Sequence, residues 1–409
     1  MANTNAQGKV PNVSQHGYSS FRTDLFGRIK TSEPYTLFDS SHRYQQNRDF
    51  SEETSGSGTT AYLADESSLS LQVGTSSGDK VTLESRKVFP YQPGKSLQVM
   101  QTFVMSSAKA NLRQRAGYFS RQNGVYLEQD GLQTYLVLRS YVSGQVSEIR
   151  VAQADWNIDQ VNGDGPSDYQ LDLSKGQIFW SEFEWLGLGS VRVGFVFDGY
   201  FVPVHQFNHA NLVTSVYMTT ASLPIRYEIE NTGATTSSSA FKQVCATVIS
   251  NGGYFKPTES YTAIRQSATV GTSFYPLVAL RMATGRTDSV VIPDAINISP
   301  TSAGEFEYAL IRNPTGLTGG SWTTHSPKNN VEFNTTATAM TGGDILLQGF
   351  FSTTNQTSES ATVVDDKNFA FQLGRSNLET PVSDIFVLAC RISSGTSAVK
   401  SSLAWYDLL

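Results

Sequence analysis

Short runs in which apolar and polar residues alternate recur from Ala61 onward, and they limit the possible folds more than any other feature of the sequence. In the run Ser96–Met105, every second residue from Leu97 is apolar except Gln101. A period of two is typical of a strand with one buried face, and no stretch keeps helical spacing beyond about two turns. The pattern therefore predicts an all-β protein of antiparallel sheets with little helix.

Turn residues separate these runs. Asp130-Gly131 lies inside GVYLEQDGLQTYLVL, and Asp198-Gly199 follows the alternating run Val191–Phe197. An Asp-Gly pair tolerates the positive φ angles of a tight hairpin turn. We therefore expect a β-hairpin at each pair.

The 409 residues are too many for one hydrophobic core, since single cores stop growing at about 250–300 residues. Residues 1–62 contain few apolar runs, and Thr235–Ser239 contains no residue that forms cores. These changes in composition predict three parts. They are an N-terminal arm and linker at 1–62, a lectin-like (concanavalin-like) or jelly-roll β-sandwich at 63–248, and a second β-sandwich at 249–409.

The N-terminal part combines apolar residues, which could serve as anchors, with a stretch whose composition predicts flexibility. The anchors, which keep no regular period, are Phe26, Ile29, Tyr35, Leu37 and Phe38. Burying three or four such side chains would contribute about 1.5–3 kcal/mol each. We expect an attachment arm that docks on a neighbouring protein, with the Gly- and Ser-rich stretch Ser51–Thr60 as a flexible joint. An irregular extension packed on its own domain explains the same residues equally well.

The overall composition excludes some partners. The net charge is -6, and charged residues make up 16% of the chain, so no cluster of basic residues is available to neutralise phosphates. No run approaches the ~18 consecutive apolar residues of a membrane helix, and the N-terminus has no apolar signal-peptide core. We therefore expect no nucleic-acid binding, no membrane insertion, and synthesis in a cytosol. Cys245 and Cys390 lie in apolar runs, which predicts two buried free thiols.

Two groups of polar residues could hold a metal ion. His205 and His209 lie four residues apart, as paired zinc ligands can. Acidic residues at 159, 164, 168 and 172 lie among glycines, and such oxygens suit calcium. Neither spacing matches a known metal motif, and Asn-Gly and Asp-Gly pairs are common in turns. We predict no metal site and no cofactor, with a calcium ion near Asp159–Asp172 as the open alternative.

Glu182 and Glu184 lie two residues apart on one face of an expected strand, as the carboxylate pair of a glycosidase could. Their expected separation of ~7 Å neither requires nor forbids that role. The same alternation is typical of an ordinary strand. No nucleophile elbow and no phosphate-binding loop occurs in the sequence. We therefore predict no catalytic residues, and we expect that the chain is not an enzyme.

Several long segments carry a resemblance to a known family. They are Phe26–Tyr44, Lys87–Met105, Arg115–Gly131, Gln153–Ser167 and Trp185–Gly233. Over about residues 25–250, the chain resembles a family of virion structural proteins encoded by marine bacteriophages, notably cyanophages, and by some large viruses. The family is known mainly as particle-associated, so the resemblance implies no catalytic residues.

This resemblance implies a non-enzymatic structural component of a bacteriophage virion, in the tail, baseplate or fibre. Its expected partners are itself, as a homo-oligomer with a trimer favoured, and other virion proteins. One alternative is an adhesin that binds host-surface glycans on aromatic platforms such as Trp156, Trp180 or Trp322. A capsid decoration protein is the other.

Overall fold

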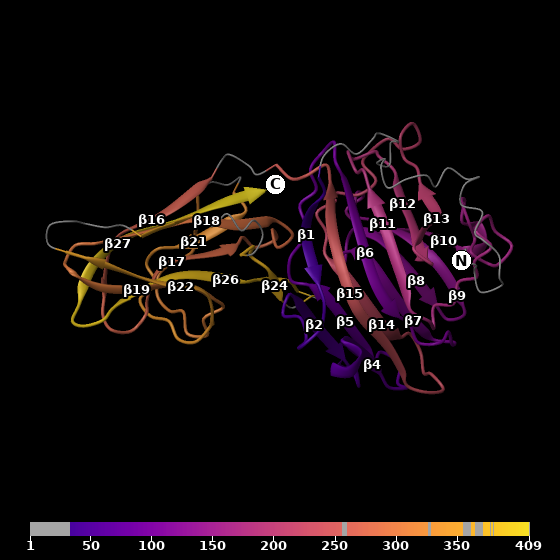
Figure 1. The fold of residues 1–409 in the computed structure, drawn as a ribbon, viewed down its shortest axis with the longest axis horizontal. Coiled ribbons are helices and arrows are strands. Elements are labelled where there is room, and N and C mark those ends of the chain that lie inside the picture. The colour runs from indigo at the N-terminus through magenta and orange to yellow at the C-terminus, as the bar shows by residue number, and fades with distance from the viewer. Residues whose placement is uncertain are drawn as a thin grey trace. The chain divides into compact units, whose positions relative to one another are not determined.

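The computed structural model describes residues 33–255, 260–325, 329–354, 361–364, 371–376, 378 and 380–408. Among these described residues, strands account for 55% and helices for 2%. The chain divides into two compact units, Met1–Phe255 and Lys256–Leu409 (Figure 1). The predicted fold class, all-β with antiparallel sandwiches, is confirmed. Within the described residues, no helix is long and apolar enough to cross a membrane.

The first unit is a sandwich of two antiparallel sheets. In spatial order, the first sheet contains β13 (Tyr200–Phe207), β12 (Val191–Phe197), β11 (Gln177–Phe183), β6 (Ser96–Val104), β15 (Ser239–Asn251), β4 (Ser68–Val73) and β3 (Thr59–Leu63), and β1 (Tyr35–Ser40) also pairs with β15. The second sheet contains β10 (Ser147–Ala152), β9 (Gln133–Ser140), β8 (Gly124–Asp130), β7 (Leu112–Phe119), β14 (Ile225–Asn231), β5 (Lys80–Ser85) and β2 (Phe50–Ser55).

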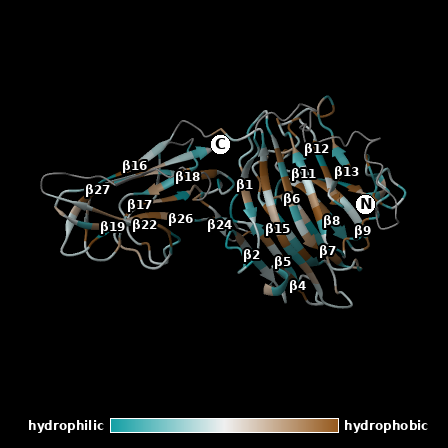
Figure 2. Ribbon diagram, viewed as in Figure 1, coloured by the Kyte–Doolittle hydropathy of each residue, from teal (hydrophilic) through white to brown (hydrophobic). Residues whose placement is uncertain are grey.

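Aromatic side chains join the two sheets across the core. The rings of Tyr118 and Phe183 lie 5.2 Å apart, and those of Tyr227 and Phe241 lie 5.9 Å apart. Figure 2 shows hydrophobic and hydrophilic segments alternating along the strands. Alternation with a period of two places one set of side chains in this core and the other set on an outer face.

The two predicted hairpins are present. Asp198 and Gly199 form the turn between β12 and β13, with φ angles of 50° and 81°. Asp130 pairs with Gln133, so the turn between β8 and β9 begins at Gly131 rather than at the aspartate.

The outer face of the second sheet carries buried charges instead of the polar, solvated side chains usual there. Arg226 donates hydrogen bonds to Glu84 at 2.6 Å and to Glu228 at 2.7 Å. Arg115 donates to Glu128 at 2.6 Å and to Glu228 at 3.0 Å. All five side chains are buried. We call this set, with Arg139, Glu148, Arg150 and Asp130 beside it, the charge lattice.

Ion pairing outweighs desolvation in the charge lattice. Burial disfavours the charged form of Glu228, but Arg226 and Arg115 hold the pKa of its carboxyl well below the usual range. The pKa of Arg226 is raised, because its two carboxylate partners overcome the cost of burial. Buried charges of this kind are tolerated only while every partner is present.

Removing Arg226 should therefore destabilise the first unit strongly. We expect Arg226→Met to lower the free energy of unfolding by about 3–5 kcal/mol, because the buried carboxylates of Glu84 and Glu228 each lose a buried cationic partner. The matched control is Lys242→Met, which removes a more exposed ion pair with Glu66 and should cost at most about 1 kcal/mol. Urea unfolding measures both; equal losses would show that the lattice adds nothing beyond a surface ion pair.

The predicted N-terminal arm is wrong for the residues that the structure describes. Leu37 and Phe38 are buried in β1, where a β-bulge turns both neighbouring side chains inward. The Phe38 ring lies 4.9 Å from Phe89 and 5.9 Å from Phe50, which belongs to the opposite sheet. These anchors therefore belong to the core of their own sandwich.

Of the three remaining anchors, the structure describes one. Tyr35 also lies in β1, and its ring packs 5.6 Å from that of Tyr254. Phe26 and Ile29 lie outside the described residues. The attachment role of these two residues stays a prediction.

The stretch Ser51–Thr60 is not a flexible joint. It contains most of β2 and the start of β3, which pair with β5 and β4. Asp79 fixes the turn between them, because its carboxylate accepts hydrogen bonds from the amide and hydroxyl of Ser57 at 2.8 and 2.6 Å. The predicted boundary between 248 and 249 also falls inside β15, so the first unit extends to Phe255.

The second unit is a smaller sandwich of two antiparallel sheets. One contains β16 (Tyr261–Val270), β27 (Ser397–Leu408), β18 (Val290–Pro300) and β23 (Ala361–Val364). The other contains β20 (Thr323–Thr324), β21 (Val331–Asn334), β17 (Tyr275–Met282), β26 (Ile385–Ile392), β19 (Gly304–Arg312) and β22 (Asp344–Thr353). Side chains from both sheets, including Trp405, Leu403, Leu388 and Phe306, form its core.

The two cysteines are free thiols, as predicted. Cys390 is buried in the core of the second unit, and burial raises its pKa to about 12. Cys245 is only half-buried, with its sulfur 3.3 Å from the hydroxyl of Thr102. The prediction of burial is therefore correct for Cys390 and wrong for Cys245.

Candidate functional site

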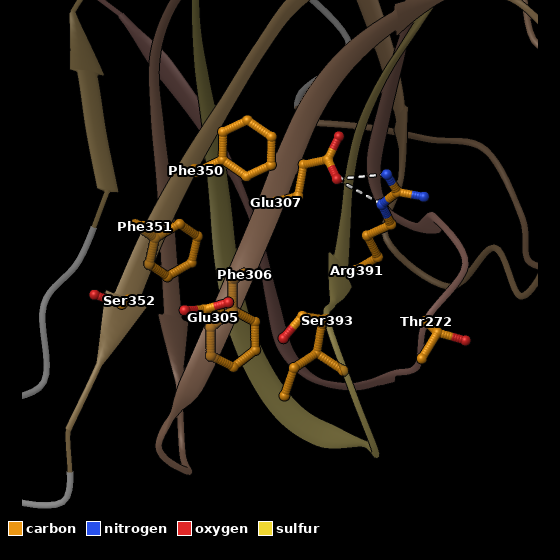
Figure 3. Close-up of a pocket in the computed structure, with 10 residues that line it drawn as sticks. Thr272, Glu305, Phe306, Glu307, Phe350, Phe351, Ser352, Arg391 and Ser393 are labelled. Atoms are coloured by element: carbon orange, nitrogen blue, oxygen red, sulfur yellow. Dashed lines mark hydrogen bonds and ion pairs between the residues drawn. The ribbon is translucent and has the colours of Figure 1, made fainter.

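A pocket of about 660 Å³ opens on the second unit, where β19, β22 and β26 lie side by side (Figure 3). Its lining residues are Thr272, Glu305, Phe306, Glu307, Phe350, Phe351, Ser352, Arg391, Ile392 and Ser393. The three strands contribute most of these side chains, and Thr272 lies in the loop before β17. The pocket is therefore built on a rigid sheet rather than on a long loop.

The strand register brings three dissimilar side chains into one row. Glu307 on β19 pairs with Phe350 on β22 and with Arg391 on β26. Directly paired residues project from the same face of a sheet, with Cβ atoms about 4.5–5.5 Å apart. A carboxylate thus stands between an aromatic ring and a guanidinium group.

Hydrogen bonds fix the charged half of this row. Arg391 donates to one carboxylate oxygen of Glu307 through Nε at 2.7 Å and through Nη2 at 2.5 Å. Gln348 donates to the other oxygen. The ring of Phe274 also lies 4.7 Å from the guanidinium carbon of Arg391. The pair is therefore held in one orientation, and its charges cancel.

The aromatic half of the row is open to solvent. Phe350 is 77% exposed, whereas the next residue, Phe351, stacks on Phe306 at 5.3 Å toward the core. Exposed hydroxyl groups of Ser352, Ser393 and Thr272 complete the lining. An open ring beside fixed donors and acceptors can bind a ligand that has one apolar face and a rim of hydroxyl groups.

The predicted carboxylate pair of the first unit is not open. Glu182 is 8% exposed and accepts a hydrogen bond from Ser96 at 2.7 Å, and Glu184 is fully buried. These residues therefore do not form an accessible glycosidase site.

Two of the three expected aromatic platforms are also buried. Trp156 donates to the carbonyl of Val151, and Trp180 donates to the carbonyl of Phe195. Trp322 is half-buried, with the guanidinium of Arg281 above its ring at 4.3 Å. The sequence did not single out Phe350, because alternation alone does not say which face of a strand remains uncovered.

The histidines serve separate local contacts. Nδ1 of His205 accepts a hydrogen bond from the amide of Asn157 at 3.2 Å. The ring of His209 stacks on Tyr217 at 3.8 Å, and its Nδ1 donates to the carbonyl of Gly189 at 2.7 Å. Each imidazole ring thus makes hydrogen bonds or ring contacts with its own neighbouring residues.

The acidic loop binds its own backbone. The two oxygens of Asp159 accept hydrogen bonds from the amides of Val161 and Ser167, each at 2.8 Å. Asp172 accepts from Ser174 at 2.6 Å, and this bond lowers its pKa. In the part of the chain that the structure describes, no three His, Cys, Asp or Glu side chains gather as a metal site.

No family model matches the chain, and no curated protein matches it. Solved structures with a similar arrangement include the Emp47p carbohydrate recognition domain, at 12% identity and a TM-score of 0.34, covering 55% of this chain and 100% of that chain. Another is a Bacillus licheniformis β-glucanase, at 9% identity and 0.32, covering 53% and 98%. A third is the CBM2 module of an evolved Dit of Lactobacillus casei BL23 phage J-1, at 8% and 0.35, covering 55% and 99%.

The expectation that the chain is not an enzyme is corrected by this comparison. Its similar structures include a glucanase as well as carbohydrate-binding domains. One architecture can host unrelated activities. The missing catalytic motifs in the sequence therefore do not exclude catalysis.

The burial of His205 predicts a dependence of stability on pH. Burial lowers the pKa of His205 from 6.5 to about 4, so the unfolded chain binds a proton in this interval that the folded chain does not. The stability that neutral His205 contributes is complete above pH 6.5 and is lost as the pH falls toward 4. We expect His205→Asn, which can still accept from Asn157, to lose less stability between pH 7.5 and 4.5 than the unchanged protein.

Urea unfolding at several pH values measures this difference. Replacing the exposed His325 by asparagine is the matched control for the loss of an imidazole ring. Identical profiles for the His205 variant and the unchanged protein would contradict the assignment.

Proposed function

We propose that the protein is a structural component of a bacteriophage particle that binds glycans on the host surface through the pocket of its second unit. The observation that carries the binding role is the open ring of Phe350 beside the fixed pair Glu307–Arg391. The particle role rests on the sequence segments that resemble marine bacteriophage virion proteins. A tail, baseplate or fibre is the position that suits a glycan-binding component.

A sugar ring is complementary to both the aromatic part and the polar part of the pocket. A pyranose ring has a face of C–H groups that can lie on a phenyl ring, and burying this face removes apolar area from water. Its hydroxyl groups both donate and accept hydrogen bonds. Arg391 offers donors, and bonds to charged groups are stronger than those between neutral groups. The exposed hydroxyl groups of Ser352, Ser393 and Thr272 offer acceptors, while the buried Glu307 orients Arg391.

The neutral charge of the pair points to uncharged sugars. Because Glu307 already neutralises Arg391, an acidic sugar gains little net attraction at this position. Exposed Glu305 adds a negative charge to the lining. The pocket therefore fits a neutral hexose residue better than a uronic or sialic acid.

The first unit supports the architectural half of the proposal. Its charge lattice spans neighbouring strands of one sheet and leaves Glu228 fully neutralised by Arg226 and Arg115. A particle component must stay folded outside the cell, and a cross-linked sheet suits that requirement. We further propose that copies associate with one another and with other particle proteins, as components on symmetry axes do.

A substitution at the open ring tests the binding role. We expect Phe350→Leu to weaken binding of neutral host-surface oligosaccharides at least roughly tenfold, which is about 1.4 kcal/mol, because leucine keeps apolar area but has no flat face. Phe350→Trp should retain binding. Calorimetric titration of the whole protein measures the affinities.

Ile345→Ala provides the matched control, since Ile345 is also exposed on β22 but does not line the pocket. Equal affinity of Phe350→Leu and the unchanged protein would reject the pocket as the glycan site. Cleavage of the oligosaccharide during the titration would add hydrolysis as a second role, for which Glu305 and Glu307 are the nearest carboxylates.

A further inference from the structure

Strand β10 (Ser147–Ala152) forms an edge of the second sheet in the first unit. Among the described residues it pairs with β9 alone, and the register of the two strands is unbroken over its whole length. At an edge of the first sheet, β13 carries Pro203 and a register shift opposite β12. Proline and bulges are features that keep further strands from pairing with a sheet edge. β10 has neither, so its edge is open to another strand.

The hairpin between β8 and β9 shows which way each backbone group points. The amide of Gly131 donates to the carbonyl of Leu112 on β7 at 2.9 Å. Successive residues of an antiparallel strand direct their backbone groups to opposite sides. Asp130, the residue before Gly131, therefore points to β9 and bonds to its partner Gln133. Counted from Gln133, every second residue of β9 points to β8, and the residues between them point to β10.

The same alternation leaves the backbone groups of two β10 residues directed away from the sheet. Leu138 is one of the β9 residues that point to β10, and its partner there is Ile149. Ile149 therefore bonds back to β9, and the amides and carbonyls of its neighbours Glu148 and Arg150 face the open edge. No residue that the structure describes bonds to these amides and carbonyls.

The side chains of β10 make this edge self-complementary. Ile149 is 58% exposed, although it projects from the same face as the buried Leu138. Glu148 and Arg150 are exposed on the opposite face, where Arg150 donates to the rest of the charge lattice through Nε and Nη2 and Glu148 accepts through Oε1. To the described residues, Nη1 of Arg150 and Oε2 of Glu148 make no hydrogen bond.

We propose that β10 pairs antiparallel with β10 of a second copy of the chain, about a two-fold axis that passes Ile149. Glu148 of each copy then lies opposite Arg150 of the other copy, and their outward amides and carbonyls form the hydrogen bonds between the strands. Ile149 lies opposite Ile149 of the second copy as a non-hydrogen-bonded pair, the kind in which Cα atoms come closest, about 4.5 Å apart. Two seven-stranded sheets thereby become one continuous sheet.

Charge pairing selects this register over its neighbours. An axis at Glu148 or at Arg150 would place that side chain opposite its own copy, and like charges directly opposite are destabilising. A shift of one residue would bring side chains of opposite faces together. A partner strand must therefore present a base, an apolar residue and an acid opposite Glu148, Ile149 and Arg150. β10 itself, running antiparallel, presents them in that order.

A two-fold contact of this kind joins two copies and leaves no edge of β10 for a third. The assembly is therefore a dimer, rather than the trimer expected from the sequence. Pairing at β10 rests on the proposed association of copies and specifies it, while glycan binding by the second unit is independent of it.

Sedimentation equilibrium of the full-length protein tests the pairing. The unchanged protein should be a dimer, and Ile149→Lys should raise its dissociation constant at least roughly tenfold, because two ammonium groups would face each other at the axis. The matched control is Ile264→Lys, since Ile264 is 56% exposed on β16 of the second unit, and it should leave the dimer unchanged. Association that persists unchanged in Ile149→Lys would overturn pairing at β10 but not the association of copies. A monomer at every concentration of the unchanged protein would overturn both.

A mixture of two variants separates loss of the contact from damage to the fold. Ile149→Lys and Ile149→Glu should each associate weakly alone, since like charges meet at the axis. An equal mixture of both should recover the dimer, because an ammonium group then faces a carboxylate. No recovery in the mixture would overturn the proposal. Calorimetric titration of the same variants with oligosaccharide measures glycan binding separately.

Discussion

The pairing of Arg226 with Glu84 and Glu228 is the interaction on which the second sheet of the first unit depends. Charges removed from water are costly, and mutual attraction compensates only when every group is paired. Sheet geometry meets this requirement because the residues on one face of adjacent strands repeat at fixed spacing. The charge lattice therefore requires one strand register, because a shift of one residue in β14 would turn Arg226 and Glu228 to the opposite face of the sheet.

The same pair of functional groups has a different role in each unit. In the first unit, the arginine and its carboxylates are buried among other charges, and they stabilise a sheet. In the second unit, Glu307 and Arg391 pair on a sheet face beside an open aromatic ring. Arg226 is 2% exposed and has no capacity left for a ligand, whereas the half-buried Arg391 still offers donors at the pocket wall, where Glu307, 8% exposed, holds it in place. Exposure, rather than residue type, separates scaffold from recognition.

The sequence was sufficient for the fold class, because alternation and Asp-Gly turns are local signals. It was not sufficient for Ser51–Thr60, whose strands are completed by β4 and β5 and whose turn is fixed by Asp79. The candidate site was also missed, since Glu307, Phe350 and Arg391 are far apart in sequence and meet only through strand register. The tryptophans were misjudged for a related reason: a strand pattern does not show which of its faces another element covers.

A crystal structure of the full-length protein with a neutral oligosaccharide tests the central claim most directly. The account predicts a sugar ring lying flat on Phe350, with hydroxyl groups within hydrogen-bond distance of Arg391. A sugar bound elsewhere on the protein, with this pocket empty, would contradict it.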